Sequence, residues 1–339
     1  MRKEILFAIF FGTIIGLIFT FGILRIDKVI KNKPNSNNPS NTAISADPNA
    51  LTAGNSQLTL LKPQNTQVFG EDVIQVSGMT KSDSFIVATG GTSDLIYKSK
   101  SDGSFDFKYE IDPSLNFLSI TSVTDTNERQ NSKLEVIYSS EFTQKEDAED
   151  ISQKVDNKMD AVLNHPVFFK GTVTDSVNEN LQIKTDNGEI GQIKIISGTT
   201  TFAKVGKTTT KISESDVAIG DYILALGYKK QNGVLEAVRI LVTSLETSSE
   251  VKIFFGAVVN KNKADMDVDE KNTGEIDIII DNNSKTYKGE LENPQKIRFA
   301  DIKENDLVIG TYSTTDSENT ARRIYILESA TPTPTPPEK

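Results

Sequence analysis

Three aspartates at alternate positions come closest, among the residues of this chain, to the spacing of a metal site: Asp265, Asp267 and Asp269. They match the first half of a calcium-binding loop, which continues with a glycine and then a bidentate glutamate six residues further on. Glu270 and Ile276 occupy those two places. The apolar residues between the aspartates instead favour a strand whose carboxylates face water. We therefore predict no metal site, and calcium at the three aspartates is the minority alternative.

The residue types that usually carry catalysis are scarce. The chain has one histidine, His165, no cysteine and no tryptophan. A lone imidazole cannot complete a zinc site, and no Gly-x-Ser-x-Gly elbow accompanies it for nucleophilic catalysis. Nothing among the 47 acidic residues picks out a pair for glycoside hydrolysis. Asp221 and Asp306, which recur in a repeat described below, suit a turn better than catalysis. We predict no catalytic residue and no cofactor, with a membrane-tethered hydrolase as the lesser alternative.

The first 24 residues predict where the protein works. Residues 5–24 carry no charge, and a helix of that length spans about 30 Å, the thickness of the hydrocarbon core of a bilayer. No small-x-small cleavage site follows closely, and the lack of cysteine excludes a lipobox. An uncleaved membrane anchor is therefore favoured over a signal peptide.

Two features of this anchor leave alternatives open. Two basic residues precede the span and four follow it, which by the positive-inside rule would put the body in the cytoplasm. The composition of the remainder favours an extracytoplasmic body, and we adopt that orientation. Small residues also recur at four-residue intervals, a spacing that would let two helices form a homodimer, although an ordinary single span is favoured. These residues are Ala8, Gly12, Gly16 and Thr20.

Charge limits the partners of the chain. A formal net charge of -10 argues against nucleic acid and against adhesion to an anionic lipid surface. The lack of cysteine excludes disulfides and thiolate chemistry. The expected partners are the lipid bilayer, through residues 5–24, and a protein or glycan at the cell surface.

Composition divides the chain into segments. Asn, Ser, Pro and Ala dominate a stretch before residue 58 that cannot bury enough apolar surface to order itself, and a Thr-Pro run closes the chain. The predicted order is a short basic N-terminus at 1–4, the anchor at 5–24, a disordered stalk at 25–57, a β-sandwich at 58–140, a helical connector at 143–164, small β-barrels at 167–245 and 251–329, and a Thr/Pro-rich tail at 330–339.

Residues 58–140 predict a sandwich of about seven short strands, because apolar and polar residues alternate between glycine and aspartate turn signals. The motifs IQVSG (74–78), DGSFDF (102–107) and LEVIY (134–138) make this segment resemble a bacterial immunoglobulin-like domain of the type appended to glucodextranase. The resemblance implies the fold and carries over no functional residue.

One amphipathic helix is predicted between the sandwich and the barrels. A capping box begins at Thr143, Pro166 follows the end, and a charged face backs an apolar stripe. A connector whose stripe packs on a neighbouring domain is favoured over a helix that binds a partner or dimerises. The stripe is Ala148, Ile151, Val155, Met159 and Val162.

A duplication accounts for residues 167–329. Three anchors align in register, a coincidence that chance does not explain. They are 169–173 with 254–258 and 216–224 with 301–309, both at an offset of 85 residues, and 239–242 with 323–326 at an offset of 84.

Each unit of the repeat predicts a small, closed or nearly closed β-barrel, which buries short strands without exposed edges. Asn187-Gly188 and Asn232-Gly233 are hairpin signals, and Gly220 and Asn305 stand at one position that predicts a positive φ. The Asp-Val-x-x-Gly-Asp stretch at 216–221 is similar to that of a β-barrel domain of unknown function recurrent in exported bacterial proteins. This similarity implies a fold and no activity.

These inferences predict a mainly β, non-enzymatic, membrane-anchored bacterial surface protein. It would cross the cell membrane once and display its modules outside for adhesion, scaffolding or envelope organisation. The alternative is a carbohydrate-binding protein or an accessory subunit of a cell-envelope enzyme.

Overall fold

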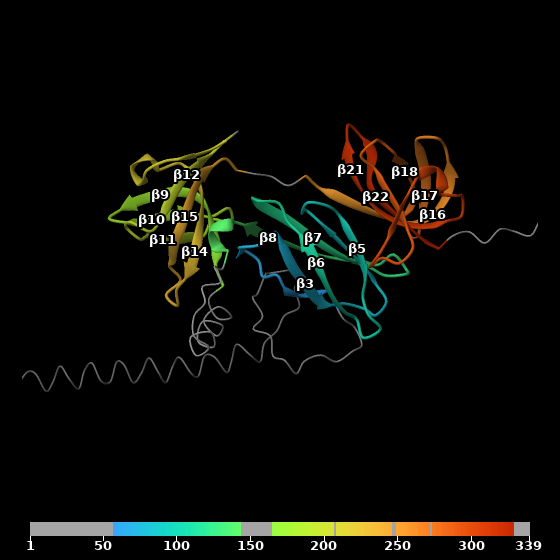
Figure 1. Ribbon diagram of the computed structural model, residues 1–339, viewed down its shortest axis with the longest axis horizontal. Helices are drawn as coiled ribbons and strands as arrows, with labels where there is room; N and C mark the ends of the chain where they lie inside the picture. Colours follow the sequence, from blue (N-terminus) through green and yellow to red (C-terminus); the bar gives the residue numbers. More distant parts are fainter. Residues whose placement is uncertain (1–56, 144–164, 207, 246–248, 272, 329–339) are drawn as a thin grey trace, which may run out of the picture. The chain divides into compact units, whose positions relative to one another are not determined.

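A computed structural model describes residues 57–143, 165–206, 208–245, 249–271 and 273–328 (Figure 1). The regular elements of these residues are β-strands and three short 3-10 turns, so the prediction of a mainly β protein is confirmed. Within these ranges no helix is long and apolar enough to cross a membrane. The predicted anchor at 5–24 and, beyond Thr143, the predicted connector lie outside the described residues.

The first group of strands, here called the sandwich, forms two sheets. One sheet has the order β1-β3-β6, and the other runs β2-β8-β7-β4-β5 at one end of a longer sheet. The strands are β1 (Thr59–Lys62), β2 (Gln67–Phe69), β3 (Val73–Met79), β4 (Phe85–Thr89), β5 (Leu95–Lys98), β6 (Ser104–Glu110), β7 (Leu115–Val123) and β8 (Arg129–Tyr138), followed by the 3-10 turn η1 (Ser140–Phe142).

Alternation of apolar and polar residues explains how the two sheets pack. In β6, Phe105, Phe107 and Tyr109 are buried, while the residues between them are exposed. These rings pack against residues of β4, β7 and β8 in the opposite sheet, including Ile86 and Ile120. The predicted period of two therefore places one face of each sheet in a shared core and leaves the other face outside.

The second group, here called barrel 1, closes on itself. The pairings β9–β10, β10–β11, β11–β15, β15–β14 and β14–β9 form a ring, and the core inside it holds Ile183 and Ile240. The elements are β9 (Val167–Val177), β10 (Asn180–Lys184), β11 (Ile190–Ile195), β12 (Thr201–Val205), β13 (Thr209–Lys211), the turn η2 (Glu214–Asp216), β14 (Tyr222–Lys229) and β15 (Leu235–Thr243).

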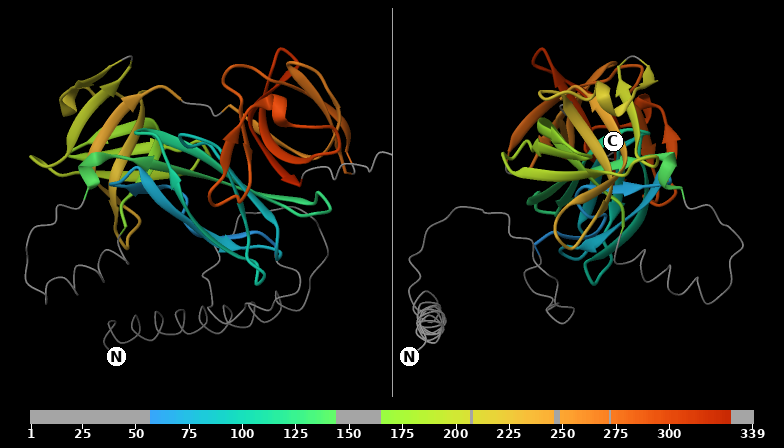
Figure 2. Two further views of the ribbon diagram at one scale, coloured as in Figure 1. Left: turned by 45° about the vertical axis from the view of Figure 1, so that its right-hand side comes forward. Right: turned by 90° about the vertical axis from the view of Figure 1, so that its left-hand side faces the viewer.

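The third group, barrel 2, repeats this order element by element. Its ring runs β16–β17, β17–β18, β18–β22, β22–β21 and β21–β16, and Figure 2 shows its orange to red strands curling around one another. The elements are β16 (Val251–Lys261), β17 (Asp265–Glu270), β18 (Gly274–Ile279), β19 (Lys285–Lys288), β20 (Gln295–Ile297), the turn η3 (Phe299–Asp301), β21 (Leu307–Thr315) and β22 (Glu318–Glu328).

One turn of the repeat has the same construction in both barrels. Gly220 has a φ of +98° and Asn305 a φ of +67°, so the predicted positive φ is confirmed. The Oδ2 atom of Asp221 accepts the backbone N–H of Ala218 at 2.8 Å, and that of Asp306 accepts the N–H of the residue three before it, also at 2.8 Å. The two recurring aspartates therefore hold a turn, as predicted.

Candidate functional site: a cleft on the outer face of the sandwich

The outer face of the larger sandwich sheet carries the site. Strands β7 and β8 pair antiparallel, and alternate residues such as Leu118 and Val136 point into the sandwich core. The residues between those point outward, as expected of a pleated sheet. From one end to the other, the outward cross-strand pairs are Leu115/Ile137, Phe117/Glu135, Ser119/Lys133, Thr121/Asn131 and Val123/Arg129. Leu115/Ile137 is apolar, Val123/Arg129 combines an apolar residue with an arginine, and the three pairs in the middle are mostly polar.

The first end of this face joins barrel 1. Strand β2 of the sandwich pairs with β9 at Gln67 and Val167, so one sheet continues from module to module. Apolar side chains of both modules pack around this continuation, and an ion pair between Arg239 and Glu141 lies beside it. The packed residues are Val68, Leu115, Ile137 and Phe142 with Phe168, Leu224, Leu226 and Leu241. We call this contact the first junction.

The other end joins barrel 2 through a second apolar cluster, the second junction. The rings of Phe85 and Phe255 lie 5.6 Å apart, and Phe255 is only 4 % exposed. The buried members are Val87, Ile96 and Val123 of the sandwich with Ile253, Phe255, Ile309 and Tyr325 of barrel 2.

A buried carboxylate adds a polar centre to the second junction. The side chain of Asp94 is 2 % exposed, and its two oxygens accept hydrogen bonds from Nε and Nη2 of Arg322 at 2.7 and 3.0 Å. The hydroxyl of Thr311 donates a third hydrogen bond at 2.6 Å, and Arg323 donates to the Asp94 carbonyl. These donors satisfy a charge that would be costly to bury alone.

A second ion pair borders the same junction. Arg129 donates from Nη2 to Glu270 at 2.6 Å and from Nη1 to the carbonyl of Ile253 at 2.9 Å. The Glu270 carboxylate also accepts the backbone N–H of Phe255 at 3.0 Å and the hydroxyl of Thr273 at 3.0 Å. The outward pair Val123/Arg129 is therefore entirely used by barrel 2.

Both barrels use the same face for docking. Residues of the first junction stand 84 or 85 positions before residues of the second: Phe168 before Ile253, Leu224 before Ile309, and Leu241 before Tyr325. Two positions break the pattern: Lys170 stands where barrel 2 has Phe255, and Leu226 stands where barrel 2 has Thr311.

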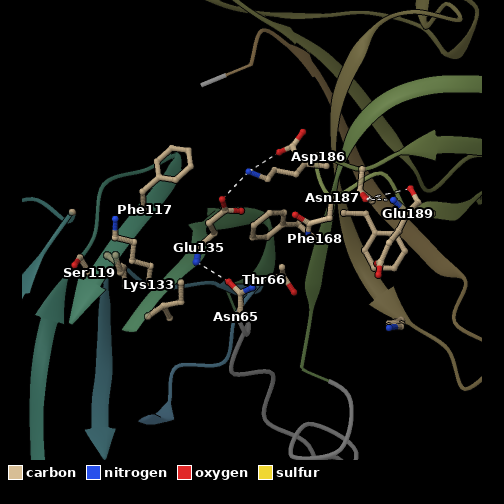
Figure 3. Close-up of a pocket in the computed structure, with 18 of the residues that line it drawn as sticks. Asn65, Thr66, Phe117, Ser119, Lys133, Glu135, Phe168, Asp186, Asn187 and Glu189 are labelled. Atoms are coloured by element: carbon tan, nitrogen blue, oxygen red, sulfur yellow. Dashed lines mark hydrogen bonds and ion pairs between the residues drawn. The ribbon is translucent and has the colours of Figure 1, made fainter. Parts of the chain in front are cut away.

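Between the two junctions the outer face of the sheet lies open and forms the floor of a cleft of about 900 Å³. Its walls are the loops of barrel 1 around residues 185–192 and 229–233 and the start of β16. Figure 3 shows Phe117, Ser119 and Lys133 on the sandwich side and Asp186 and Asn187 on the barrel 1 side. The volume falls within the range of small-molecule sites in proteins.

Lys170 links the two sides of the cleft. Its Nζ atom donates to Glu135 of the sandwich at 2.7 Å and to Asp186 of barrel 1 at 3.0 Å, drawn as dashed lines in Figure 3. The hydroxyl of Tyr222 also donates to Asp186. Burial lowers the pKa of the Lys170 ammonium, but the hydrogen bonds to the two carboxylates outweigh burial and raise the pKa above its ordinary value. The lysine therefore stays charged at neutral pH and cannot serve as a base there.

Two partly exposed phenylalanines line the cleft, one from each module. Phe117 comes from β7, with the Lys170 ammonium 5.4 Å from its ring centroid, and Phe169 comes from β9, with the Lys229 ammonium at 5.8 Å. Both distances are near the outer limit of a cation–π contact. Gly191 makes room for one of the rings, since a Cβ there would lie 3.3 Å from the Phe169 ring and 2.9 Å from Ile183.

Uncharged polar groups complete the wall. The Asn131 amide donates to the hydroxyls of Ser119 and Thr121, each at 2.7 Å, which orders the floor. Asn65 accepts the backbone N–H of Glu135 at 2.8 Å. Such amides and hydroxyls can bind and orient a polar ligand through hydrogen bonds.

The calcium candidates are separated from this cleft. Asp265, Asp267 and Asp269 lie on β17 of barrel 2, where Met266 and Val268 between them are fully buried, as the predicted strand requires. The first two aspartates accept hydrogen bonds from asparagine side chains at 2.6 and 3.0 Å. Across the ranges that the structure describes, no group of three or more His, Asp or Glu side chains is placed to hold a metal ion.

The other sequence candidates lie elsewhere. His165 shares a 2.8 Å hydrogen bond with Gln64 just before β9, a position that suits a structural role. The helix-packing candidates Ala8, Gly12, Gly16 and Thr20 lie outside the described residues.

The cleft and both junctions were not predicted from the sequence. The available signal was the outward set of β8 residues, which changes from arginine through polar residues to isoleucine along a single strand. The outer face combines residues of β7 and β8, and the sequence alone does not give the pairing of these two strands. The alternation therefore predicted the sandwich but not the polar patch on its outer face.

Comparisons with known proteins identify no family. No protein-family model and no curated protein matches the chain. Among solved structures, one match comes from work on the host cell surface retention of a 1.5-MDa bacterial ice-binding adhesin. It is 8% identical, covers 81% of this chain and 100% of that chain, and has a TM-score of 0.18, at which likeness carries no argument about fold or function.

Proposed function

We propose that the chain is a membrane-anchored, non-enzymatic surface protein that binds a ligand outside the cytoplasm in the cleft between its sandwich and barrel 1. Residues 5–24 would hold it in the membrane, and the segment up to residue 57 would act as a stalk. The observation that carries the proposal is the cleft itself, about 900 Å³ in volume and lined by polar groups of two modules. Adhesion is the role that such a site serves most directly.

The chemistry of the wall supports binding rather than turnover. Two carboxylates of the lining, Glu135 and Asp186, both accept hydrogen bonds from the Lys170 ammonium. These contacts join the sandwich to barrel 1, so the two carboxylates serve the structure of the cleft.

A scaffolding role has an observation of its own. The second junction fixes barrel 2 to the sandwich with an apolar cluster and the buried Asp94–Arg322 pair. A protein that only presented its modules in a fixed geometry would need this junction and not the cleft.

Protease shaving of intact cells that carry the full chain tests orientation and anchoring. Peptides from residues 58–328 should be released, while residues 5–24 stay with the membrane. Release from inverted vesicles alone would place the body in the cytoplasm and overturn the proposal.

Co-sedimentation tests the cleft. The full chain in nanodiscs should sediment with envelope polysaccharide isolated from the organism that encodes it. Ser119→Trp fills the floor of the cleft and should abolish sedimentation. Ser77→Trp, on the outer face of the opposite sheet, is the matched control and should not. Equal sedimentation of the two variants would exclude the cleft as the binding site.

A further inference from the structure

The charges of the cleft nearly cancel. Its lining holds three lysines and four carboxylates, and Lys170 bridges two of the four. A wall of this kind gives little long-range attraction for a polyanion or a polycation, unlike a cleft lined by charges of one sign. Recognition must then come from hydrogen bonds and contact area, which favours an uncharged ligand.

The uncharged lining groups are of two chemical kinds in equal number. Five are carboxamides and five are hydroxyls. A carboxamide offers a donor and an acceptor side by side, so it can pair with two neighbouring hydroxyl groups of a ligand. Gln192 of β11 and Asn187 of the hairpin before it are exposed members of this set.

The two phenylalanine rings add the apolar part. Phe117 on the floor and Phe169 on the barrel 1 wall come from different modules, and each is partly exposed. Rings of this kind bury a large area against the C–H groups of a ligand that presents its hydroxyls elsewhere. On β8 the floor runs from Asn131 to Glu135, which is roughly 14 Å at about 3.4 Å per residue, so it suits a chain better than a single small molecule.

We propose that the cleft binds a segment of a neutral polysaccharide. Phe117 and Phe169 would contact the sugar rings, and the carboxamides around them would pair with sugar hydroxyls. This inference rests on the proposed function and names its ligand class. Lys170 would keep the two walls together and is a positioning residue, because its ammonium is already bound to both sides.

Direct binding measurements test the ligand class. The full chain in nanodiscs is titrated with neutral oligosaccharides (glucans, mannans, galactans and N-acetylated aminosugar chains). Heparin and polygalacturonate are the polyanionic comparisons, and an unstructured polar peptide is the polypeptide comparison. We expect binding to at least one neutral family, little change between low and high salt, and competition with envelope polysaccharide.

Two pairs of variants locate the site. Phe117→Ala should weaken oligosaccharide binding about tenfold, and Gln192→Ala about threefold to tenfold. Phe299→Ala is the matched control for the ring, because Phe299 is also partly buried beneath a lysine but belongs to barrel 2. Gln295→Ala, an exposed glutamine on β20, is the control for the amide. Circular dichroism of each variant shows whether it folds, and Asn187→Ala replaces Phe117→Ala if the latter does not.

The outcomes separate the two proposals. If Ser119→Trp abolishes sedimentation but no neutral oligosaccharide competes, the ligand class is wrong and the binding function stands. Binding of heparin with strong salt dependence, or of the peptide, would likewise overturn the neutral polysaccharide. If Ser119→Trp has no effect, the function and the ligand class fail together.

Discussion

Barrel 1 and barrel 2 dock on one face of the sandwich through equivalent strands, yet their junctions differ in kind. The second junction is buried around Phe255, and its two buried carboxylates, Asp94 and Glu270, are each paired with an arginine. The first junction is apolar where the sheet continues from β2 to β9, and on the side of Lys170 it borders the cleft. The docking face has an apolar centre in both copies, while its border is closed by ion pairs in barrel 2 and opens into a cleft in barrel 1.

A few substitutions between the copies account for this difference. In barrel 2, Thr311 and Arg322 bind Asp94. Barrel 1 has Leu226 and Val238 at the corresponding positions. Lys170 corresponds to Phe255. Each change replaces an apolar side chain with a polar or charged one, or the reverse. The difference between the junctions can therefore be tested by exchanging these residues between the barrels.

The largest effect is expected from Phe255→Lys, which gives barrel 2 the residue of barrel 1. An ammonium at a site that is 4 % exposed should lower the free energy of unfolding by about 3–5 kcal/mol. The reverse change, Lys170→Phe, should cost about 1 kcal/mol or less, because Glu135 and Asp186 remain partly exposed. Urea denaturation of the full chain measures both, and equal costs would mean that the junctions do not differ as described.

Asp94→Asn should have the next largest effect. It keeps the shape of the side chain but leaves the Arg322 guanidinium without its counter-charge, at a cost of about 2 kcal/mol. The cost is smaller than for a fully buried pair because the Arg322 side chain is partly exposed. Glu128→Gln, in the exposed Lys81–Glu128 pair, is the control and should change stability by about 0.5 kcal/mol or less. If the two variants lose the same stability, the buried pair does not hold the junction.

The β-strands and some of their turns could be predicted from the sequence because their signals are local. The alternation in β6 and the Asn-Gly turns between β10 and β11 and between β14 and β15 depend only on neighbours in the chain. The positive φ at Gly220 and Asn305 was likewise predictable, because the steric cost belongs to the residue itself.

The junctions could not be predicted, because their contacts join residues that are far apart in the chain. Asp94 reads as one of many aspartates near a turn, and its partners Thr311 and Arg322 lie more than 200 residues away in the chain. Phe117 and Glu135 likewise share the cleft only through the register of β7 with β8. Contacts of such separation leave no period in the sequence, so the candidate site emerged only from the fold.

A smaller effect is expected at the bridge across the cleft. A double-mutant cycle of Lys170→Met and Glu135→Gln should give a coupling energy of about 0.5–1.5 kcal/mol at pH 7. Because the pKa of Lys170 is raised in the folded state, its contribution is complete below the ordinary lysine value of about 10.4 and disappears as pH rises through the higher folded pKa. Unfolding measured on both sides of that range checks the sign. A coupling that grew at high pH would show that the ammonium does not hold the walls.

The smallest effect is expected in the hairpin of β17 and β18 in barrel 2, which is equivalent to the hairpin of β10 and β11 in barrel 1. Gln182 pairs across the strands with Gln192 in barrel 1, whereas the equivalent pair in barrel 2 is Asp267 and Asp277. Like charges placed directly opposite each other destabilise a sheet. Asp277→Gln should therefore stabilise barrel 2 slightly, as it gives that barrel the residue of barrel 1.

The pH dependence of this last change follows from one pKa. Burial first, and then the charges of Asp267, Asp265 and Glu318, raise the pKa of Asp277 in the folded state. Above that pKa the folded protein holds a carboxylate that it disfavours, so Asp277→Gln should gain a few tenths of a kcal/mol at pH 7. The gain should fade as pH drops through the folded pKa and be absent below about 3.9, where both states are protonated. Thermal unfolding of the parent protein and of Asp277→Gln at pH 7 and below about pH 3.9, with and without calcium, measures this gain in stability. If calcium stabilised the parent protein and not the variant, these aspartates would be a cation site and the comparison of the two hairpins would need revision.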